Sequence, residues 1–595
     1  MSEYRAPLQE MRFVLRELAS LEQIAALPGC EEATPDVVDA VLDEAARFAN
    51  EVLSPLNVVG DRVGARWQDK VVTTAPGFAD AYRQFVDNGW NGLACDPLHG
   101  GQGLPTLVGT AVNEMWKGAN HAFSLCPMLT QGAIEALNVA GSPAQKDAYL
   151  PKLVSGEWTG TMNLTEPQAG SDLAAVRTRA EPQADGSYKL FGQKIFITYG
   201  EHDMAGNIIH FVLARVAGAP EGVKGISLFL VPKFLVNGDG SLGARNDVYS
   251  VSIEHKLGIH GSPTSVMAFG DNGGALGYPV GELNRGLEYM FIMMNAARFN
   301  VGLEGLGDAE RAYQRAVAYA RDRIQGSEAG VKGGGKVPIL RHPDVRRLLL
   351  SMRARVEAMR AVAYVTAAAM DVAHRLPAGP GRDSSQAFVD LMIPIVKGWS
   401  TETAIAVASD GVQVHGGMGY IEETGAAQHL RDARITAIYE GTTAIQANDL
   451  VGRKVGRDQG AVAKEVIGHM RAVLVSLKDD AELRPIATQL APAIDALEKS
   501  VQWVAANYAG DVRSVLASAV PFLNLFGIVA GGWQMARAAW LARQHIAAGE
   551  NDPFWQAKLA TSRFYADHYL TQAPGLAQAV VGGATATLAM ADESF

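Results

Sequence analysis

Residues 431–446, with the sequence RDARITAIYEGTTAIQ, place one carboxylate, that of Glu440, among apolar and small residues. Ile438 and Tyr439 precede Glu440, and Gly441 follows it. A carboxylate between apolar side chains is poorly solvated, so we expect the pKa of Glu440 to rise. A carboxylate with a raised pKa can remove a proton from a weak carbon acid near neutral pH. The segment therefore favours a catalytic base.

A structural role for Glu440 explains the same pattern. The carboxylate would then cap a helix or pair with Arg434 or Arg453, and structural ion pairs also perturb carboxylates. The choice depends on whether the rest of the chain supplies the other parts of an active site.

The composition limits the class of protein. A chain of 595 residues is too long for one hydrophobic core, so we expect three or four domains. The 48% of hydrophobic and 19% of charged residues are typical of a folded globular protein. The net charge of -11 argues against nucleic-acid binding. Cys30, Cys95 and Cys126 lack metal-type or redox-type spacing, which predicts no metal site and a reducing compartment.

The chain ends and one apolar run bear on localisation. Residues 1–13 contain no apolar stretch of a signal peptide, and the final DESF is no peroxisomal signal, so we expect a cytoplasmic protein. Residues 515–536 carry no charge and are long enough to span a bilayer. Because this run also contains proline, glycines and polar residues, we favour a buried bundle helix over an integral membrane segment.

The periodicity predicts an α+β protein that is mostly α. We expect an N-terminal helical domain over residues 1–160, because apolar residues recur there at helical spacing. Residues 161–280 form a β domain, either a barrel or two packed sheets, and its strands do not alternate with helices as in a Rossmann fold. The expected strands cover residues 188–198, 208–216, 226–231, 248–253 and 265–269.

The remainder of the chain returns to helix. Residues 281–455 form a helical-bundle domain, and residues 456–595 form a further helical extension with 11 Lys or Arg and 13 Asp or Glu. We expect a flexible linker over residues 326–335. The expected bundle helices cover residues 287–323, 342–375, 385–409 and 425–434.

Two further motifs accompany the Glu440 segment. In residues 162–172 (MNLTEPQAGSD), Thr165 and Ser171 are small hydrogen-bond donors, and Pro167 and Gly170 favour turns, so the loop can bring backbone N–H groups against a flat polar ring. In residues 194–200 (KIFITYG), Phe196 and Thr198 share one face of an expected strand. A plain connecting loop and a half-buried strand remain the structural alternatives.

Taken in order, these motifs resemble those of the acyl-CoA dehydrogenase family over residues 160–450, and residues 431–446 resemble the segment that carries the family's base. The resemblance implies FAD as cofactor and an acyl-CoA thioester as substrate. Phe196 would stack on the isoalloxazine ring, and the Thr198 hydroxyl would bond toward its N5. The family usually has tryptophan where this chain has Phe196. The other implied flavin contacts of the first motif are Met162, Leu164, Thr165, Gly170 and Ser171.

The resemblance also implies how substrate is bound. In residues 295–299 (NAARF), Arg298 resembles an arginine that lies near the base and the acyl-CoA. Some relatives carry the base one residue earlier, where this chain has Ala297, so Glu440 is left as the candidate base. The implied substrate-binding residues are Ser171, Asn295, Arg298 and Gly441.

A homodimer follows from the same resemblance. Arg323, followed by Gln325, resembles the arginine that reaches the FAD diphosphate of the neighbouring subunit. A cation and close-approach glycines suit a diphosphate. Thr442 would contact the adenylate side of FAD, although the family's usual glutamine two residues later is Ala444. The implied loop from across the dimer contains Gln413, Gly416 and Gly417.

The implied reaction is α,β-dehydrogenation of a saturated acyl-CoA to a trans-2-enoyl-CoA, with electrons passed to electron-transferring flavoprotein. Residues 194–203 and 255–267 resemble the long bacterial branch of the family. That branch includes 3-(methylthio)propionyl-CoA and general fatty acyl-CoA dehydrogenases, and both substrates remain open. An acyl-CoA oxidase and a DNA-binding flavoprotein of the same fold are the alternatives. The near-neutral extension disfavours the second, which needs a basic surface.

Overall fold

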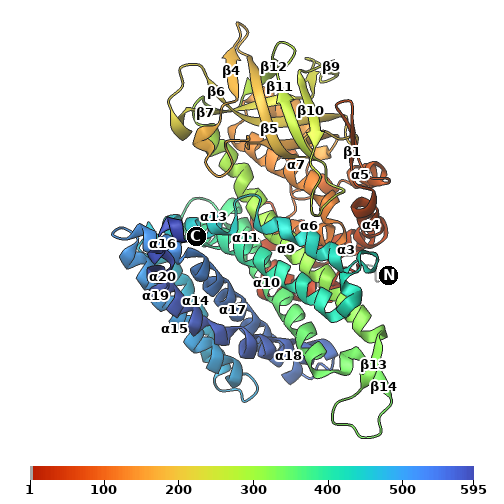
Figure 1. The fold of residues 1–595 in the computed structure, drawn as a ribbon, viewed down its shortest axis with the longest axis vertical. Helices are drawn as coiled ribbons and strands as arrows, with labels where there is room; N and C mark the ends of the chain where they lie inside the picture. Colours follow the sequence, from red (N-terminus) through yellow and green to blue (C-terminus); the bar gives the residue numbers. More distant parts are fainter. Residues whose placement is uncertain (1–3) are drawn as a thin grey trace. The chain divides into compact units, whose positions relative to one another are not determined.

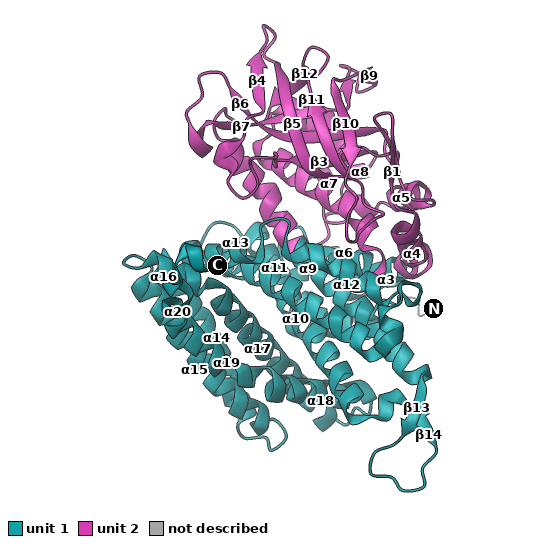
Figure 2. Ribbon diagram, viewed as in Figure 1, with its two compact units in different colours: residues 1–46, 105–118, 301–595 teal, residues 47–104, 119–300 magenta. Residues whose placement is uncertain are grey.

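The computed structural model describes residues 4–595, which form two compact units (Figure 2). Unit 1 contains the chain up to Ala46, residues 105–118 and residues 301–595. Unit 2 contains residues 47–104 and 119–300. Both units draw on segments far apart in the sequence, so they cut across the four expected domains, whose boundaries stay a prediction. The overall class is confirmed: the chain is mostly helical, with a β region in the middle.

The β region of unit 2 is one sheet of eight strands in the order β10-β11-β5-β12-β7-β6-β3 (Figure 1). Strand β4 pairs with both β5 and β6, so β5, β12, β7, β6 and β4 close into a ring. The barrel, one of the two expected arrangements, is therefore correct. The strands are β3 (Trp158–Asn163), β4 (Arg179–Pro182), β5 (Tyr188–Thr198), β6 (Asn207–Val216), β7 (Ile226–Pro232), β10 (Val248–Ile253), β11 (Thr264–Phe269) and β12 (Ala275–Pro279). Minor strands β8 (Phe234–Val236) and β9 (Leu242–Arg245) pair beside this sheet.

Alternating side chains of these strands fill the core of the β region. Leu190, Val212, Phe229 and Phe269 belong to one buried cluster, and each is at most 1% exposed. These residue types favour strands because they pack well on a pleated surface. The cluster is the buried core of this sheet.

The expected helical range 1–160 is wrong at two places. Residues 158–160 belong to β3, which pairs in parallel with β6, because Gly156 adopts φ +83° and ends α8. Strands β1 (Arg66–Gln68) and β2 (Val71–Thr73) form a hairpin within the same range. The helices of unit 2 are α4 (Ser54–Val63), α5 (Phe78–Asp87), α7 (His121–Ala140) and α8 (Pro143–Ser155), and α7 packs on β3.

Unit 1 is built from long helices (Figure 1). Helix α9 covers nearly the expected range, and it begins in unit 2 and ends in unit 1. The expected linker over residues 326–335 is wrong at its start, because β13 (Ile324–Ser327) pairs with β14 (Lys336–Pro338). The bundle helices are α9 (Gly286–Asp322), α10 (Pro343–Arg375), α11 (Pro380–His415) and α12 (Ala426–Arg434), followed by α13 (Thr443–Asp449). The N-terminal segments include α1 (Leu8–Phe13), α3 (Pro35–Phe48) and α6 (Thr106–Ala119).

The C-terminal extension packs on this bundle within unit 1. Its helix α17 is the one helix of residues 4–595 long and apolar enough to cross a membrane, yet 83% of its most apolar window is buried. A Cβ added at Gly527 would lie 2.1 Å from Trp399 of α11, so this glycine permits close packing. The expected buried bundle helix is confirmed. The longer helices of the extension are α14 (Ala461–Leu477), α15 (Arg484–Asn507), α17 (Ala519–Ala547), α18 (Pro553–His568) and α19 (Ala573–Gly582).

Candidate active site

Glu440 lies in a tight loop before α13 and has an unusual backbone. Its φ is +54°, and the next residue, Gly441, has φ +91°. An L-residue in the left-handed region is strained, and such strain persists only where the surroundings hold it. The loop that contains Tyr439, Glu440 and Gly441 is called the base loop below.

Two fully buried side chains hold the carbonyls of the base loop. Lys397 of α11 donates from Nζ to the Gly441 oxygen at 2.6 Å. Gln446 of α13 donates from Nε2 to the Glu440 oxygen at 3.1 Å. Gly441 has a backbone conformation that L side chains rarely adopt, and a Cβ there would lie 2.7 Å from Gln446 Nε2, so the position favours glycine. The backbone on either side of the candidate base is thereby fixed.

Two neighbouring contacts bear on the structural alternatives for Glu440, which are helix capping and an ion pair. Thr442 is the N-cap of α13, and its hydroxyl accepts from the Ile445 N–H at 3.3 Å. Arg453 pairs with Asp449 at 2.5 Å. Helix capping is therefore the role of Thr442 here, and its contact with an adenylate stays a prediction.

The loop after β3 is anchored to β5 within unit 2. Lys194, fully buried, donates from Nζ to Glu166 Oε1 at 2.8 Å and to the Leu164 oxygen at 3.0 Å. The Ile195 N–H donates to the Thr165 oxygen at 2.9 Å. These bonds fix the backbone around two of the implied flavin contacts. Of the others in this loop, Met162 is buried in β3, whereas Gly170 and Ser171 are exposed.

Glu166 is the centre of this anchor. Its carboxylate also accepts from the Thr178 hydroxyl at 2.6 Å and the Arg177 N–H at 2.7 Å. Burial alone would raise the pKa of Glu166, but Lys194 and these donors lower it to about 2. Burial lowers the pKa of Lys194 to about 8, against the opposing effect of Glu166. Both groups are therefore charged at neutral pH. The sequence alone does not single out this pair, although Lys194 is the one charged residue of residues 194–200.

Phe196 occupies a β-bulge of β5. The pairing with β11 passes from Ile197–Ser265 to Lys194–Met267, which leaves an extra residue on β5. Phe196 has φ +60°, and 59% of the residue is exposed. Bulges commonly re-aim side chains, and the stacking of this exposed ring on a flavin stays a prediction. Thr198, two residues on, is half-buried.

Asn295 and Arg298 lie one turn apart in the part of α9 that belongs to unit 2. The Arg298 Nη1 donates to Asn295 Oδ1 at 3.5 Å, and its guanidinium lies 6.0 Å from the centre of the Phe291 ring. Arg298 is 4% exposed. A buried arginine held by a neighbour on its own helix fits a binding role, and its contact with substrate stays a prediction.

The residues expected to act across a dimer are exposed in unit 1. One segment follows α9 and the other lies at the end of α11. The two helices are in contact there, because Tyr319 of α9 stacks on His415 of α11 at 4.3 Å between ring centres. Gly416 has φ +61°, and a Cβ there would meet nothing within 4 Å. Their contacts with FAD remain predictions. The exposed residues are Arg323, Gln325, Gln413, Gly416 and Gly417.

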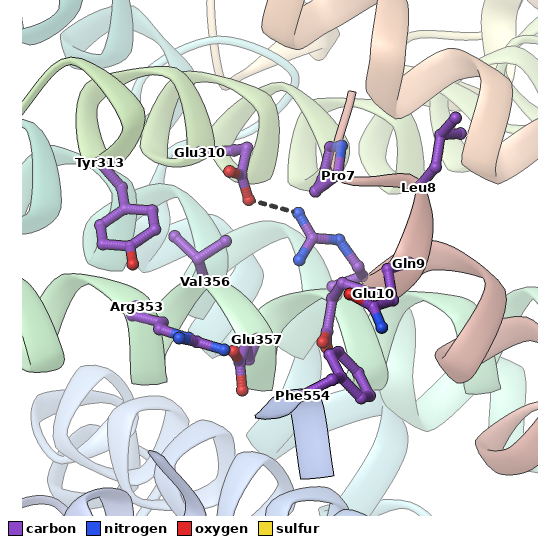
Figure 3. Close-up of a pocket in the computed structure, with 11 residues that line it drawn as sticks. Pro7, Leu8, Gln9, Glu10, Glu310, Tyr313, Arg353, Val356, Glu357 and Phe554 are labelled. Atoms are coloured by element: carbon purple, nitrogen blue, oxygen red, sulfur yellow. Dashed lines mark hydrogen bonds and ion pairs between the residues drawn. The ribbon is translucent and has the colours of Figure 1, made fainter. Parts of the chain in front are cut away.

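A charged cavity of about 320 Å³ lies elsewhere in unit 1 (Figure 3). The N-terminal segment, α9, α10 and α18 line it, and none of its lining residues is an expected site residue. Its charges are matched internally: Arg360 pairs with Glu310 at 2.6 Å, and Arg353 pairs with Glu357 at 2.7 Å. The cavity is therefore part of a buried structural network. Over residues 4–595, no cluster of three or more His, Cys, Asp or Glu is arranged to hold a metal.

Three family models match the chain in succession: the N-terminal domain of acyl-CoA dehydrogenase over residues 36–157, the middle domain over 161–271 and the C-terminal domain over 284–455. The chain belongs to the acyl-CoA dehydrogenase family. A fourth model, described as acetyl-CoA dehydrogenase C-terminal like, matches residues 464–591. The family's enzymes are oxidoreductases, and the C-terminal extension is matched by this model of its own.

Comparison with individual proteins gives the same family. The chain is 49% identical over 570 residues to 3-methylmercaptopropionyl-CoA dehydrogenase of Ruegeria pomeroyi, covering 96% of each chain. It is 33% identical to a butyryl-CoA dehydrogenase of Syntrophomonas wolfei, over 100% of this chain and 99% of that one. A Bacillus anthracis acyl-CoA dehydrogenase complexed with FAD has the same fold, with a TM-score of 0.74, 21% identity and coverage of 96% and 91%.

Proposed function

We propose that this enzyme carries out FAD-dependent α,β-dehydrogenation of a saturated acyl-CoA, with Glu440 as the base that removes the α proton. The observation that carries this proposal is the base loop: a carboxylate on a left-handed backbone, fixed by Lys397 and Gln446. Catalytic groups must be held within a narrow range of geometry, and second-layer hydrogen bonds provide that rigidity.

The residues of unit 2 fit a flavin. Phe196 offers an exposed ring, and the backbone beside it is fixed by Lys194 and Glu166. Nothing lies within 4 Å of a Cβ placed on Gly170, so a cofactor has room to approach this backbone. When bound, FAD supplies the acceptor for the β hydrogen and its electron pair. Phe196 and Thr198 orient the ring, and Arg323, from a second subunit of a homodimer, neutralises the diphosphate.

The protein's own groups prepare the substrate. An α proton is too weak an acid for a free carboxylate, so the thioester carbonyl must be polarised. We assign this task to the backbone N–H of Glu440, as in an oxyanion hole. Arg298 and Asn295 bind the acyl-CoA, and burial of the ligand excludes water from the base. Loss of the α proton to Glu440 and of the β hydrogen gives the trans-2-enoyl-CoA.

The substrate we favour is 3-(methylthio)propionyl-CoA, because 49% identity to the Ruegeria enzyme exceeds the 33% to the butyryl-CoA dehydrogenase. Short and medium fatty acyl-CoAs are the competing substrates. Electron-transferring flavoprotein takes the electrons in the second half of the reaction.

The test is flavin bleaching under anaerobic conditions with a panel of acyl-CoAs that includes the methylthio thioester. The flavin of the wild-type protein should bleach, and the acyl-CoA that bleaches it fastest identifies the substrate class. Glu440→Gln should keep FAD and bind the enoyl-CoA product but lose nearly all bleaching. Wild-type bleaching by Glu440→Gln would overturn the base assignment. If the enzyme released hydrogen peroxide in air at the rate of turnover, oxygen would be its electron acceptor in place of electron-transferring flavoprotein.

A further inference from the structure

A second carboxylate, Glu304, lies directly behind the base loop. It belongs to the part of α9 in unit 1, and it is 0% exposed. The Tyr439 hydroxyl donates to Glu304 Oε2. Tyr439 immediately precedes Glu440, so this hydrogen bond fixes the residue before the candidate base. Lys397 fixes Gly441, the residue after it.

The packing of three helices places Glu304 there. A Cβ at Gly302 would lie 2.6 Å from Val396 of α11, so α9 and α11 approach closely one residue before Lys397. A Cβ at Gly307 would lie 2.9 Å from the Lys117 side chain of α6, and Gly307 is three residues after Glu304 on the helix. Close approach on both sides buries the carboxylate between α6, α11 and the base loop.

Lys117 completes the arrangement. This lysine is 1% exposed, and burial lowers its pKa to about 8, while the charge of Glu304 acts in the opposite direction. Burying a carboxylate and an ammonium costs desolvation energy, and the attraction between their opposite charges offsets part of that cost. Burial first, and then Glu304, raises the pKa of Tyr439 well above its ordinary value, so the phenol keeps its proton and donates.

We propose that Glu304 is a positioning residue for the reaction: it fixes the Tyr439 hydroxyl and thereby holds Glu440 in its left-handed conformation. Glu304 touches neither substrate nor flavin in this role. The base loop is thus held from both sides, by Glu304 through Tyr439 and by Lys397 through Gly441. This inference rests on the proposed function of Glu440 as base.

The first test compares Tyr439→Phe with Tyr364→Phe. Tyr364 also donates its hydroxyl to a buried glutamate, Glu114, at 2.7 Å, so both variants lose one equivalent hydrogen bond. Tyr439→Phe should lower kcat about tenfold or more, because a base displaced by a fraction of an ångström loses rate steeply. Its KM and FAD content should stay within about twofold of wild type. Tyr364→Phe should keep the wild-type kcat. Equal kcat in the two variants would overturn the proposal.

The second test uses Glu304 itself. Glu304→Gln keeps an oxygen that accepts from Tyr439 and should retain most of kcat, whereas Glu304→Leu should match Tyr439→Phe. In the double variant Glu304→Leu/Tyr439→Phe, the decrease in kcat should be no larger than in either single variant, as expected for two residues that act through one hydrogen bond. Additive losses, or Glu304→Gln as slow as Glu304→Leu, would overturn the positioning role.

The two proposals fail separately. An inactive Glu440→Gln together with an unimpaired Tyr439→Phe would overturn only the role of Glu304. An active Glu440→Gln would overturn the base itself.

Discussion

Lys558 and Glu10 form a buried ion pair between residues 548 positions apart in the chain, with Nζ 2.5 Å and 2.6 Å from the two carboxylate oxygens. Lys558 also donates to Glu357 of α10 at 2.8 Å. One ammonium from the C-terminal extension thus joins the N-terminal helix α1 and the bundle within unit 1. The extension is therefore integral to the fold of this unit and is no loose appendage.

Replacing Lys558 should destabilise unit 1. Lys558→Met leaves Glu10 and Glu357 buried without their shared partner, which costs about 3–5 kcal/mol for a buried pair broken on one side. Thermal unfolding measures the loss. The control is Arg563→Ala in the same helix, whose exposed ion pair with Asp567 should contribute little. Equal melting temperatures for the two variants would contradict the integral role of the extension.

Lys397→Met should slow turnover without loss of cofactor. The variant removes the donor to the Gly441 oxygen and frees the base loop to leave its strained conformation. We expect kcat to fall roughly 100-fold, the size of effect that a displaced catalytic group produces. Lys558→Met is the matched control, since it also removes a buried lysine but should keep the wild-type kcat. An unchanged kcat in Lys397→Met would show that the loop holds its geometry without this bond.

The Lys194–Glu166 pair should make stability depend on pH in acid. The pKa of Glu166 in the folded protein is about 2, below its ordinary 4.5. A carboxylate whose pKa is lowered on folding stabilises the folded state at pH values above its ordinary pKa. This stabilisation disappears as the pH falls through the pKa of the folded state. At about 1.4 kcal/mol for each pKa unit, the lowered pKa of Glu166 taken by itself corresponds to about 3 kcal/mol at neutral pH, and the lowered pKa of Lys194 acts in the opposite direction.

Glu166→Gln removes this contribution. Its unfolding free energy should lie below that of wild type at pH 7, and the difference should shrink as the pH is lowered from about 4.5 towards 2. Denaturant unfolding at several pH values measures both. A difference that does not change between pH 7 and the lowest pH at which both proteins fold would contradict the charge-based account of this anchor.

Phe196→Gly should change stability and cofactor binding in opposite directions. Glycine relieves the left-handed strain at φ +60°, so the melting temperature of the FAD-free protein should stay the same or rise. Loss of the exposed ring should weaken FAD binding roughly threefold to tenfold. Asn284→Gly, at φ +67°, relieves a similar strain without removing an aromatic ring and should leave FAD affinity unchanged. Unaltered FAD affinity in Phe196→Gly would remove this residue from the cofactor site.

FAD release should coincide with subunit separation. Arg323 and Gln413 are exposed within one chain, and we assign both to the FAD of a second subunit. Sedimentation velocity on a dilution series, followed at the flavin wavelength and at 280 nm, compares the two events. A monomer that keeps stoichiometric FAD would contradict the shared site.

Much of the fold followed from local patterns. The long helix α9 was predictable because no proline interrupts residues 280–337, and β5 was predicted to the residue from its β-branched and aromatic composition. The start of β3 and the hairpin of β13 and β14 were missed. Both depend on pairing with partners distant in the sequence or across a glycine-rich turn, which local composition does not report.

The sequence by itself determined the family, the order of its motifs and the candidate base, because these depend on residue types at short spacing. Only the tertiary structure decided what supports them. Glu304, Lys397 and Lys117 are single charged residues within helices, and each resembles an ordinary surface charge until the helices pack. Lys397 contacts Gly441, which is 44 positions away, and Glu304 contacts Tyr439, which is 135 positions away. Burial makes those contacts strong, because water no longer competes for the charge.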